Sequence, residues 1–283
     1  MRMRLAVMMG LVCLAMASGA EEKYQTGYNI LLWPDGKPPD AQGEDWLDKP
    51  ILTVVLPPEA RRNGASVIIC PGGANVRLFH HQEGMAIAEH LNEWGVAGFV
   101  LTYRLGPRYG QSARLLDGQR AVQVVRSRAA EWKLDPQRIG MMGFSAGAGV
   151  TAITGLNVLA GDPASPDPAR RVSSRPDFAV LVYGAGGFAA TPGRAGSTPP
   201  PDAAQVKQFP PAFFIAAEDD RMSSGAVTSG QALRNAGVSA ELHIYQKGRH
   251  GFGSGFGSPE FSGWMNELHH FLELGGFLNG GRQ

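Results

Sequence analysis

Short apolar runs bounded by turn-forming residues alternate with longer stretches of helical pattern along most of the 283-residue chain. This alternation predicts strand–helix–strand units, and therefore an α/β fold with a mainly parallel central sheet flanked by helices. A chain of this length can form one large domain of that kind. The predicted strands are Ile51–Leu56, Ser66–Cys70, Gly98–Tyr103, Arg138–Gly143, Phe178–Tyr183, Ala212–Ala217 and Ala240–Tyr245. The predicted helices are Gln82–Glu93, Leu115–Trp132, Ala146–Leu159, Ser229–Asn235 and Glu260–Leu278.

The first twenty residues have the pattern of a secretory signal peptide. Arg2 and Arg4 precede an apolar run, Leu5–Met16, and the small residues Ala17–Ala20 follow it. The run is too short to span a bilayer comfortably, although an uncleaved anchor of similar shape is the alternative. We therefore expect cleavage after Ala20, a secreted or periplasmic protein without membrane association, and a single domain over residues 21–283.

Composition excludes several classes of protein. The chain is 43% apolar and 18% charged, which is typical of a globular protein with a sizeable core. A formal net charge of +1, without a basic run interleaved with aromatics, predicts no nucleic-acid partner. The mature chain would keep only Cys70, which follows three apolar residues, so we expect a buried strand residue and no internal disulfide.

The strongest local signal is the segment Gly143–Gly147, which reads Gly-Phe-Ser-Ala-Gly. It follows a predicted strand and opens a predicted helix. A serine on such a sharp turn occupies a strained backbone position, and small residues two places before and after it avoid a clash. Ser145 is therefore the candidate nucleophile, and the N–H of Ala146 at the helix start would face the attacked carbonyl. A tight turn with a capping serine is the alternative.

A second signal lies upstream in Cys70–Ala74, where Cys-Pro-Gly-Gly-Ala follows a predicted buried strand. Two glycines let the backbone curl so that N–H groups point inward, as an oxyanion hole requires. The predicted donors are Gly73 or Ala74, together with Ala146. A plain β-turn is the alternative, and a phosphate-binding loop is disfavoured because no lysine follows in the required register.

A catalytic serine needs a base, and His250 has the best position among seven histidines. It lies on a loop just past the last predicted strand and is followed by Gly251. No His-Glu-x-x-His pattern is present, so we expect neither a metal nor another cofactor. The other histidines lie in a predicted strand or helix, or directly before Glu83: His80, His81, His90, His243, His269 and His270.

The base in turn needs a carboxylate to orient it, and one strand ends in a suitable group. Ala212–Ala217 is followed by Glu218, Asp219 and Asp220. Two adjacent carboxylates on a short turn cannot both point at one imidazole. These residues alone leave Asp219 and Asp220 open as the acid.

These and other short motifs occur in order from about Ile51 to the last helix. The landmarks are Pro71-Gly72-Gly73, Glu83-Gly84, Tyr103-Arg104-Leu105, Asp117 with Arg120-Ala121, Gly143–Gly147, Asp219-Asp220 and Gly248–Gly253. In this order they resemble the α/β-hydrolase superfamily, specifically the small esterases grouped with acetylxylan esterases and feruloyl-esterase-like proteins. The resemblance implies the α/β-hydrolase fold with a small loop-built cap. It also implies Asp220 as the acid, because relatives commonly place an aspartate there, although Met222-Ser223-Ser224 replaces their Val-Val-Pro.

The combined prediction is a carboxylic ester hydrolase that works through an acyl-enzyme on Ser145, with His250 and Asp220. We expect it to remove short acyl groups, such as acetyl, from a carbohydrate or another small-molecule ester. The alternatives are a peptidase of the prolyl-oligopeptidase kind and an inactive hydrolase fold that binds carbohydrate.

Two segments rich in Pro, Gly, Ala and Ser show neither a helical nor a strand period: Gly161–Pro176 and Ala190–Pro211. Both follow the nucleophile segment. Loops of this length in a compact domain are commonly lids or binding loops. We therefore expect them to form rim or cap material over the site, with a surface insertion as the alternative.

Overall fold

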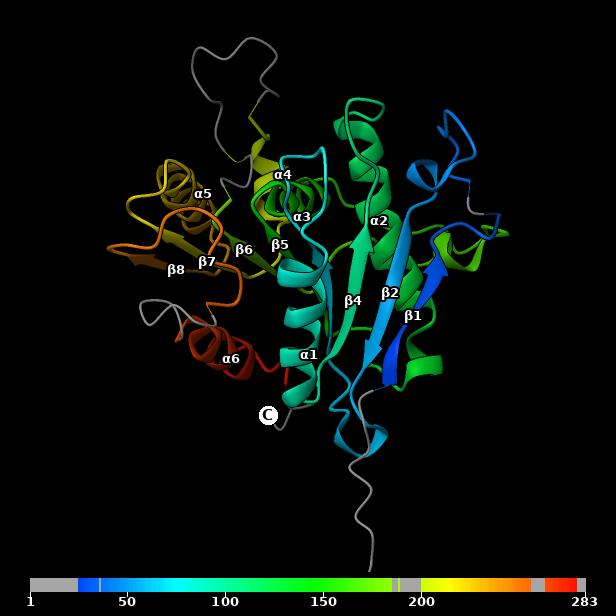
Figure 1. Ribbon diagram of the computed structural model, residues 1–283, viewed down its shortest axis with the longest axis horizontal. Helices are drawn as coiled ribbons and strands as arrows, with labels where there is room; N and C mark the ends of the chain where they lie inside the picture. The colour runs from blue at the N-terminus through cyan, green and yellow to red at the C-terminus, as the bar shows by residue number, and fades with distance from the viewer. Residues whose placement is uncertain (1–24, 36, 185–187, 189–199, 256–262, 279–283) are drawn as a thin grey trace, which may run out of the picture.

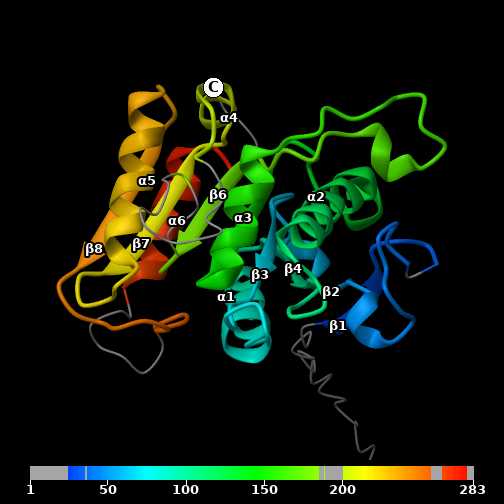
Figure 2. The ribbon, with the colours of Figure 1, turned by 90° about the horizontal axis from the view of Figure 1, so that it is seen from above.

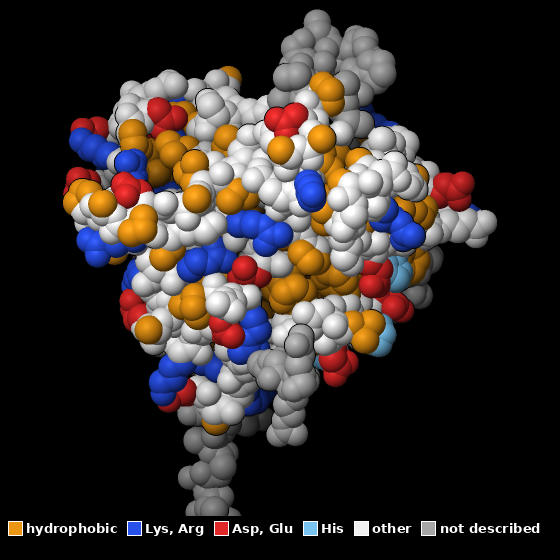
Figure 3. All heavy atoms as spheres, turned by 180° about the vertical axis from the view of Figure 1, so that it is seen from behind, with side chains coloured by type: hydrophobic (Ala, Val, Ile, Leu, Met, Phe, Trp, Pro, Cys, Tyr) orange, Lys and Arg blue, Asp and Glu red, His pale blue; other side chains and the backbone are white. Residues whose placement is uncertain are grey.

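A computed structural model describes residues 25–35, 37–184, 188, 200–255 and 263–278 (Figure 1). The predicted signal peptide and its cleavage site lie outside these residues. Within them, no helix is both long enough and apolar enough to cross a bilayer. Acidic and basic side chains are intermixed over the face shown in Figure 3, in keeping with the small net charge.

The core of the fold is an eight-stranded sheet with the order β1-β2-β4-β3-β5-β6-β7-β8. The five adjacent pairs from β4 to β8 are parallel, whereas β1 and β4 both pair with β2 in antiparallel fashion. The α/β fold class is confirmed, and the seven predicted strands are all present with ends shifted by at most one residue. The strands are β1 Gln25–Leu31, β2 Ile51–Leu56, β3 Ser66–Cys70, β4 Ala97–Thr102, β5 Ile139–Phe144, β6 Phe178–Val182, β7 Ala212–Ala217 and β8 Ala240–Tyr245.

The central strands read as unbroken apolar runs because helices cover both faces of the sheet. In β3, Val67 and Ile69 belong to one hydrophobic cluster, and Ile68 and Cys70 belong to the cluster on the other face. All four side chains are fully buried. Cys70 is thus a buried strand residue, and burial raises the pKa of its thiol far above the ordinary value.

Helices α1 and α6 cover one face of the sheet, and α2, α3 and α5 cover the other (Figure 2). A π-helical turn, His81–Met85, leads into α1, and a 3₁₀ turn, Ala129–Trp132, follows α2. The α-helices are α1 Ala86–Glu93, α2 Gln111–Ser127, α3 Ala146–Leu156, α4 Ala203–Lys207, α5 Ser223–Asn235 and α6 Trp264–Leu274.

The structure corrects the expected position of Gly161–Pro176, which contains a short 3₁₀ helix and packs against α2. Arg120 of α2 pairs with Asp167 at 2.5 Å, and Arg126 donates to the carbonyl of Ser173 at 2.6 Å. The segment therefore does not lie over Ser145. Its connection explains why: α3 starts beside the nucleophile and runs back along the sheet, so the loop after α3 emerges at the opposite edge.

The second irregular segment, Ala190–Pro211, is described only from residue 200 onward. Residues 190–199, which we expect at the rim of the site, lie outside the described residues. The remainder contains α4, a helix that sequence patterning did not predict, whose first turn is capped by Asp202 through a reciprocal contact with Gln205.

The carboxyl ends of the parallel strands bring the predicted catalytic loops to one edge of the sheet. Cys70 at the end of β3 pairs with Gly143 of β5, and Ala217 at the end of β7 pairs with Tyr245 of β8. The loops that follow these four strands carry every residue assigned a catalytic role from the sequence. Ligands of open α/β sheets bind at this edge.

Candidate active site

Ser145 lies on the turn between β5 and α3 in a strained backbone conformation, with φ 52° and ψ −113°. The turn tolerates no side chain two positions before or after the serine. A Cβ at Gly143 would overlap the carbonyl of Gly147, and a Cβ at Gly147 would overlap the carbonyl of Cys70. The spacing of small residues around the serine is therefore a steric requirement of a turn that holds the hydroxyl clear of the sheet.

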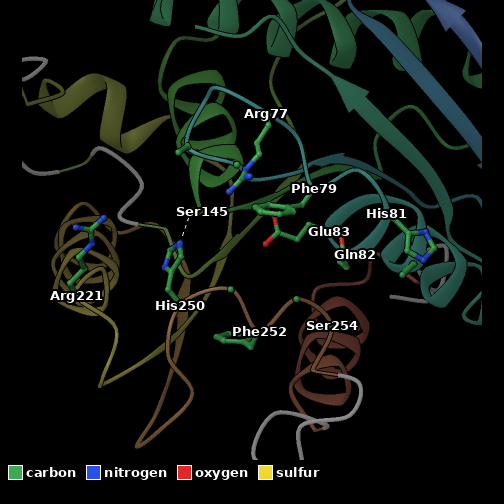
Figure 4. Close-up of a pocket in the computed structure, with 15 residues that line it drawn as sticks. Arg77, Phe79, His81, Gln82, Glu83, Ser145, Arg221, His250, Phe252 and Ser254 are labelled. Carbon is green, nitrogen blue, oxygen red and sulfur yellow. Dashed lines mark hydrogen bonds between the residues drawn. The ribbon is translucent and has the colours of Figure 1, made fainter. Parts of the chain in front are cut away.

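The structure brings Ser145, His250 and Asp220 together in one hydrogen-bonded chain, and Figure 4 shows its link between Ser145 and His250. Ser145 Oγ lies 2.7 Å from His250 Nε2, and His250 Nδ1 lies 2.7 Å from Asp220 Oδ2. Because a carboxylate can only accept, Nδ1 carries the proton, which leaves Nε2 as the acceptor for the serine hydroxyl. The chain can therefore remove a proton from Ser145.

Asp219 and Asp220 have separate contacts, and of the two Asp220 lies against the imidazole of His250. Asp220 is buried, with 4% of its surface exposed, and its other carboxylate oxygen accepts the N–H of Met222 at 2.9 Å. Asp219 instead accepts the N–H of Arg249 at 2.8 Å. The carboxylate of Asp220 faces the imidazole, and that of Asp219 holds the backbone of the loop that carries His250.

The predicted oxyanion donors lie beside the serine. Gly73, Ala74 and Ser145 line the same cavity. The N–H groups of Gly73 and Ala74 donate to no acceptor among the described residues, and Ala146 is the first residue of α3, where N–H groups lack an intrahelical partner. Donors of this kind next to a nucleophile suit an oxygen that becomes negatively charged during reaction.

Two buried residues that sequence reasoning did not assign to the site link its loops. Tyr183 donates its hydroxyl proton to Glu83 Oε1 at 2.6 Å and accepts the N–H of Gly253 at 3.2 Å. Glu83 Oε2 accepts the N–H of Gly72 at 2.7 Å. Burial and the neighbouring Glu83 carboxylate raise the pKa of Tyr183, so the hydroxyl keeps the proton that it donates.

Glu83 and Tyr183 thus connect the oxyanion loop to the loop that follows His250. A sequence signal existed for Tyr183, because it directly follows β6 at the edge of the sheet where the site lies. For Glu83 the sequence supplied only its place among the landmarks of the resemblance, because its partners come from distant segments.

The cavity over Ser145 has a volume of about 730 Å³. Its lining combines aromatic side chains, Phe79 and Phe252, with two arginines, Arg77 and Arg221. His81 also lines it but lies at the far end from the Ser145–His250 pair (Figure 4). In the part of the chain that the structure describes, no three His, Cys, Asp or Glu side chains gather as metal ligands.

Comparison with known proteins agrees with this fold. The family model BD-FAE matches residues 52–162. An acetylxylan esterase of Xylanibacter ruminicola is 30% identical over 75% of this chain and 46% of its own length. Endo-1,4-beta-xylanase B of Butyrivibrio fibrisolvens is 27% identical over 70% of this chain and 34% of its own length. The chain thus spans less than half of either curated relative.

Solved structures match over nearly their whole length. The acetyl ester-xyloside bifunctional hydrolase of Caldicellulosiruptor lactoaceticus is 30% identical with a TM-score of 0.76, covering 89% of this chain and 97% of its own. Esterase 2 of Thermogutta terrifontis, at 21% identity and a TM-score of 0.70, covers 91% and 97% and shares the fold. The chain belongs to the α/β-hydrolase superfamily and, within it, to the acetylxylan-esterase-like group of esterases.

Proposed function

We propose that the protein hydrolyses carboxylic esters, with Ser145 as nucleophile, His250 as general base and acid, and Asp220 as the carboxylate that orients the imidazole. The continuous hydrogen-bonded chain from Asp220 to Ser145 at a cavity of about 730 Å³ carries the proposal. A relative named acetylxylan esterase and one named acetyl ester-xyloside bifunctional hydrolase support it.

The reaction would proceed in two halves. Ser145 Oγ attacks the ester carbonyl while His250 Nε2 takes its proton, and the negative oxygen accepts hydrogen bonds from Ala146 and from Gly73 or Ala74. The intermediate collapses, the C–O bond to the alcohol breaks, and the imidazolium protonates the departing oxygen. Water then attacks the acyl-enzyme in the same way and releases the acid. Each oxyanion donor lowers the barrier by about 3–4 kcal/mol.

The proposed substrate is a short acyl ester, such as an acetate, on a carbohydrate. The names of the relatives support this class, since they refer to acetylxylan, xylan and acetyl ester-xyloside. The proposed location is outside the cytoplasm, on the strength of the apolar run behind Arg2 and Arg4. Acetylated polysaccharide would be met there.

The test compares Ser145→Ala with the wild type on p-nitrophenyl acetate and acetylated xylan. The variant should lose roughly four orders of magnitude in kcat, because the nucleophile is gone. A fluorophosphonate probe should label the wild type and not the variant. Ser224→Ala, which removes an exposed hydroxyl of α5, is the matched control and should retain full activity.

Near wild-type turnover by Ser145→Ala would refute the assignment. Turnover of aminoacyl anilides in place of esters would favour the peptidase alternative. A wild type that neither turns over esters nor reacts with the probe would instead indicate an inactive hydrolase fold.

A further inference from the structure

A second cavity, of about 780 Å³, lies directly beside the catalytic one. The segment 73–81 forms the wall between them: Phe79 and His81 line the catalytic side, Val76 and Leu78 line the other, and Arg77 lines both. The far wall comes from the chain after β4, the strand next to β3 in the sheet. Both cavities therefore open along the same edge of the sheet.

The rim of the second cavity carries a tryptophan that has no role in the core. Trp46 keeps 70% of its surface exposed, although tryptophan buries a large apolar area wherever a fold uses it for packing. Val76 across the cavity is 63% exposed. Exposed apolar surface concentrated around a hollow marks a binding site more often than isolated exposed residues do.

Trp46 is held in place by a polar network centred on the buried Asp48. It opens a 3₁₀ turn, Trp46–Asp48, whose Asp48 is 1% exposed. Asp48 accepts hydrogen bonds from Tyr109 and, at 2.9 Å, from Arg108, and Arg108 also pairs with Asp45 at 2.9 Å. The backbone turn that carries Trp46 is therefore fixed while its indole remains in solvent. This is the arrangement expected of a preformed contact surface.

The chemistry around the indole favours a sugar over a hydrocarbon chain. A pyranose presents an apolar C–H face that stacks on an aromatic ring, and its hydroxyls point outward to polar groups. Thr102, His80, Arg77 and Arg108 line the cavity alongside its apolar residues. A hydrocarbon chain would gain most from full enclosure, and the open indole does not provide that.

We propose that the second cavity binds sugar rings of the glycan whose ester group occupies the catalytic cavity, with Trp46 as the stacking surface. The inference rests on the proposed esterase function and extends it, because it assigns the alcohol side of the substrate to a defined place. Continuity through the shared wall at Arg77 supports this occupant.

The kinetic test uses Trp46→Ala with two substrates. KM for acetylated xylo-oligosaccharides should rise about tenfold, the loss expected for one aromatic stacking contact, whereas kcat/KM for p-nitrophenyl acetate stays within twofold. Trp46→Phe should restore most of the affinity. Leu274→Ala is the matched control, since Leu274 is 73% exposed on α6, and it should change neither substrate.

A binding test separates this inference from the proposed function. Unesterified xylohexaose, titrated calorimetrically into the wild type, should bind, and Trp46→Ala should bind about tenfold more weakly. If the wild type hydrolyses p-nitrophenyl acetate but binds no xylohexaose, the inference is overturned while the esterase function stands. Xylohexaose binding by a protein without esterase activity would support the sugar site and refute the catalytic proposal.

Two further outcomes would overturn the sugar site. One is an equal fall in kcat/KM of Trp46→Ala on acetylated xylo-oligosaccharides and on p-nitrophenyl acetate, which would mean that the residue acts through the fold. The other is a selective loss on p-nitrophenyl octanoate with the glycan substrate unaffected, which would assign the cavity to the acyl chain.

Discussion

Adjacent carboxylates at the end of β7 make different contacts with the loop that carries His250. Asp220 lies 2.7 Å from His250 Nδ1, whereas Asp219 holds the N–H of Arg249, the preceding residue. Chemically identical side chains one position apart therefore differ in direction and in burial, since Asp219 is exposed and Asp220 is buried. Sequence reasoning reached the pair from the strand pattern, but only the resemblance to relatives favoured Asp220.

This difference gives a prediction at the scale of single residues. Asp220→Asn should lower kcat on p-nitrophenyl acetate by about 10³- to 10⁴-fold, because an amide facing Nδ1 disfavours the tautomer in which Nε2 accepts. Asp219→Asn should remain within about tenfold of the wild type, since its amide oxygen can still accept the N–H of Arg249. Equal losses in the two variants would contradict the assignment of the acid.

At the scale of elements, the site depends on loops held together by Tyr183 and Glu83. Tyr183 directly follows β6, and Glu83 lies in the turn before α1. Their hydrogen bonds reach Gly72 and Gly253 in the two neighbouring loops. Neither residue contacts the Ser145 hydroxyl in the described hydrogen bonds. Their contribution is to position the loops around Ser145, which carry Gly72 and Gly253.

Removing one hydroxyl tests this positioning role. Tyr183→Phe should lower kcat on p-nitrophenyl acetate by about tenfold with KM little changed, because the loops lose their link and Glu83 loses a donor. Tyr28→Phe is the matched control: the Tyr28 hydroxyl accepts from Trp132 at 2.9 Å on the edge strand β1, away from the cavity.

Unfolding in urea distinguishes positioning from general destabilisation. Tyr183→Phe loses its bonds to Glu83 and Gly253, and Tyr28→Phe loses its bond from Trp132, so both variants should lose stability, by about 1 kcal/mol per bond. Only Tyr183→Phe should lose kcat. If Tyr28→Phe lost activity to the same extent, the Tyr183 hydroxyl would have no special role in the site.

The elements that could be predicted from sequence are those whose signal is local. Strands β3 and β7 are apolar on both faces, so their residues identify them directly. Strand β1 was missed because it lies at the sheet edge, where Tyr28 and Leu31 are 37% and 46% exposed and no apolar run marks it. The link through Glu83 was missed because it joins residues that only the fold brings together.

At the scale of the whole molecule, connectivity decides where a loop lies. Gly161–Pro176 was expected at the rim of the site from its composition alone. A helix that begins at the catalytic edge must end at the other edge, so the segment after α3 packs on α2 instead. The segment between β1 and β2 behaves differently. It begins where β1 ends, at the catalytic edge, and its Trp46 lines the second cavity there.

That segment is anchored through Asp48, which makes the stability of the molecule depend on pH in a defined direction. Burial raises the pKa of Asp48, but the hydrogen bonds from Tyr109 and Arg108 outweigh it and hold the pKa below its usual value. A carboxylate with a lowered pKa stabilises the fold above the unfolded value of about 3.9, and this contribution is lost as pH falls through the folded pKa.

At pH 7 the free energy of unfolding of Asp48→Asn should therefore be about 1–2 kcal/mol below that of the wild type, because the hydrogen bonds lose their charged acceptor. The variant should accordingly unfold at a lower urea concentration. The difference in unfolding free energy between wild type and variant should start to narrow as pH falls below about 4, where Asp48 of the unfolded wild-type chain takes up a proton while the folded carboxylate is still ionised. It should keep narrowing until pH passes the folded pKa. Urea midpoints measured from pH 7 down to pH 3 would show this. A gap of constant size over that range would mean that the charge on Asp48 contributes nothing, and that the support beneath Trp46 is held by shape alone.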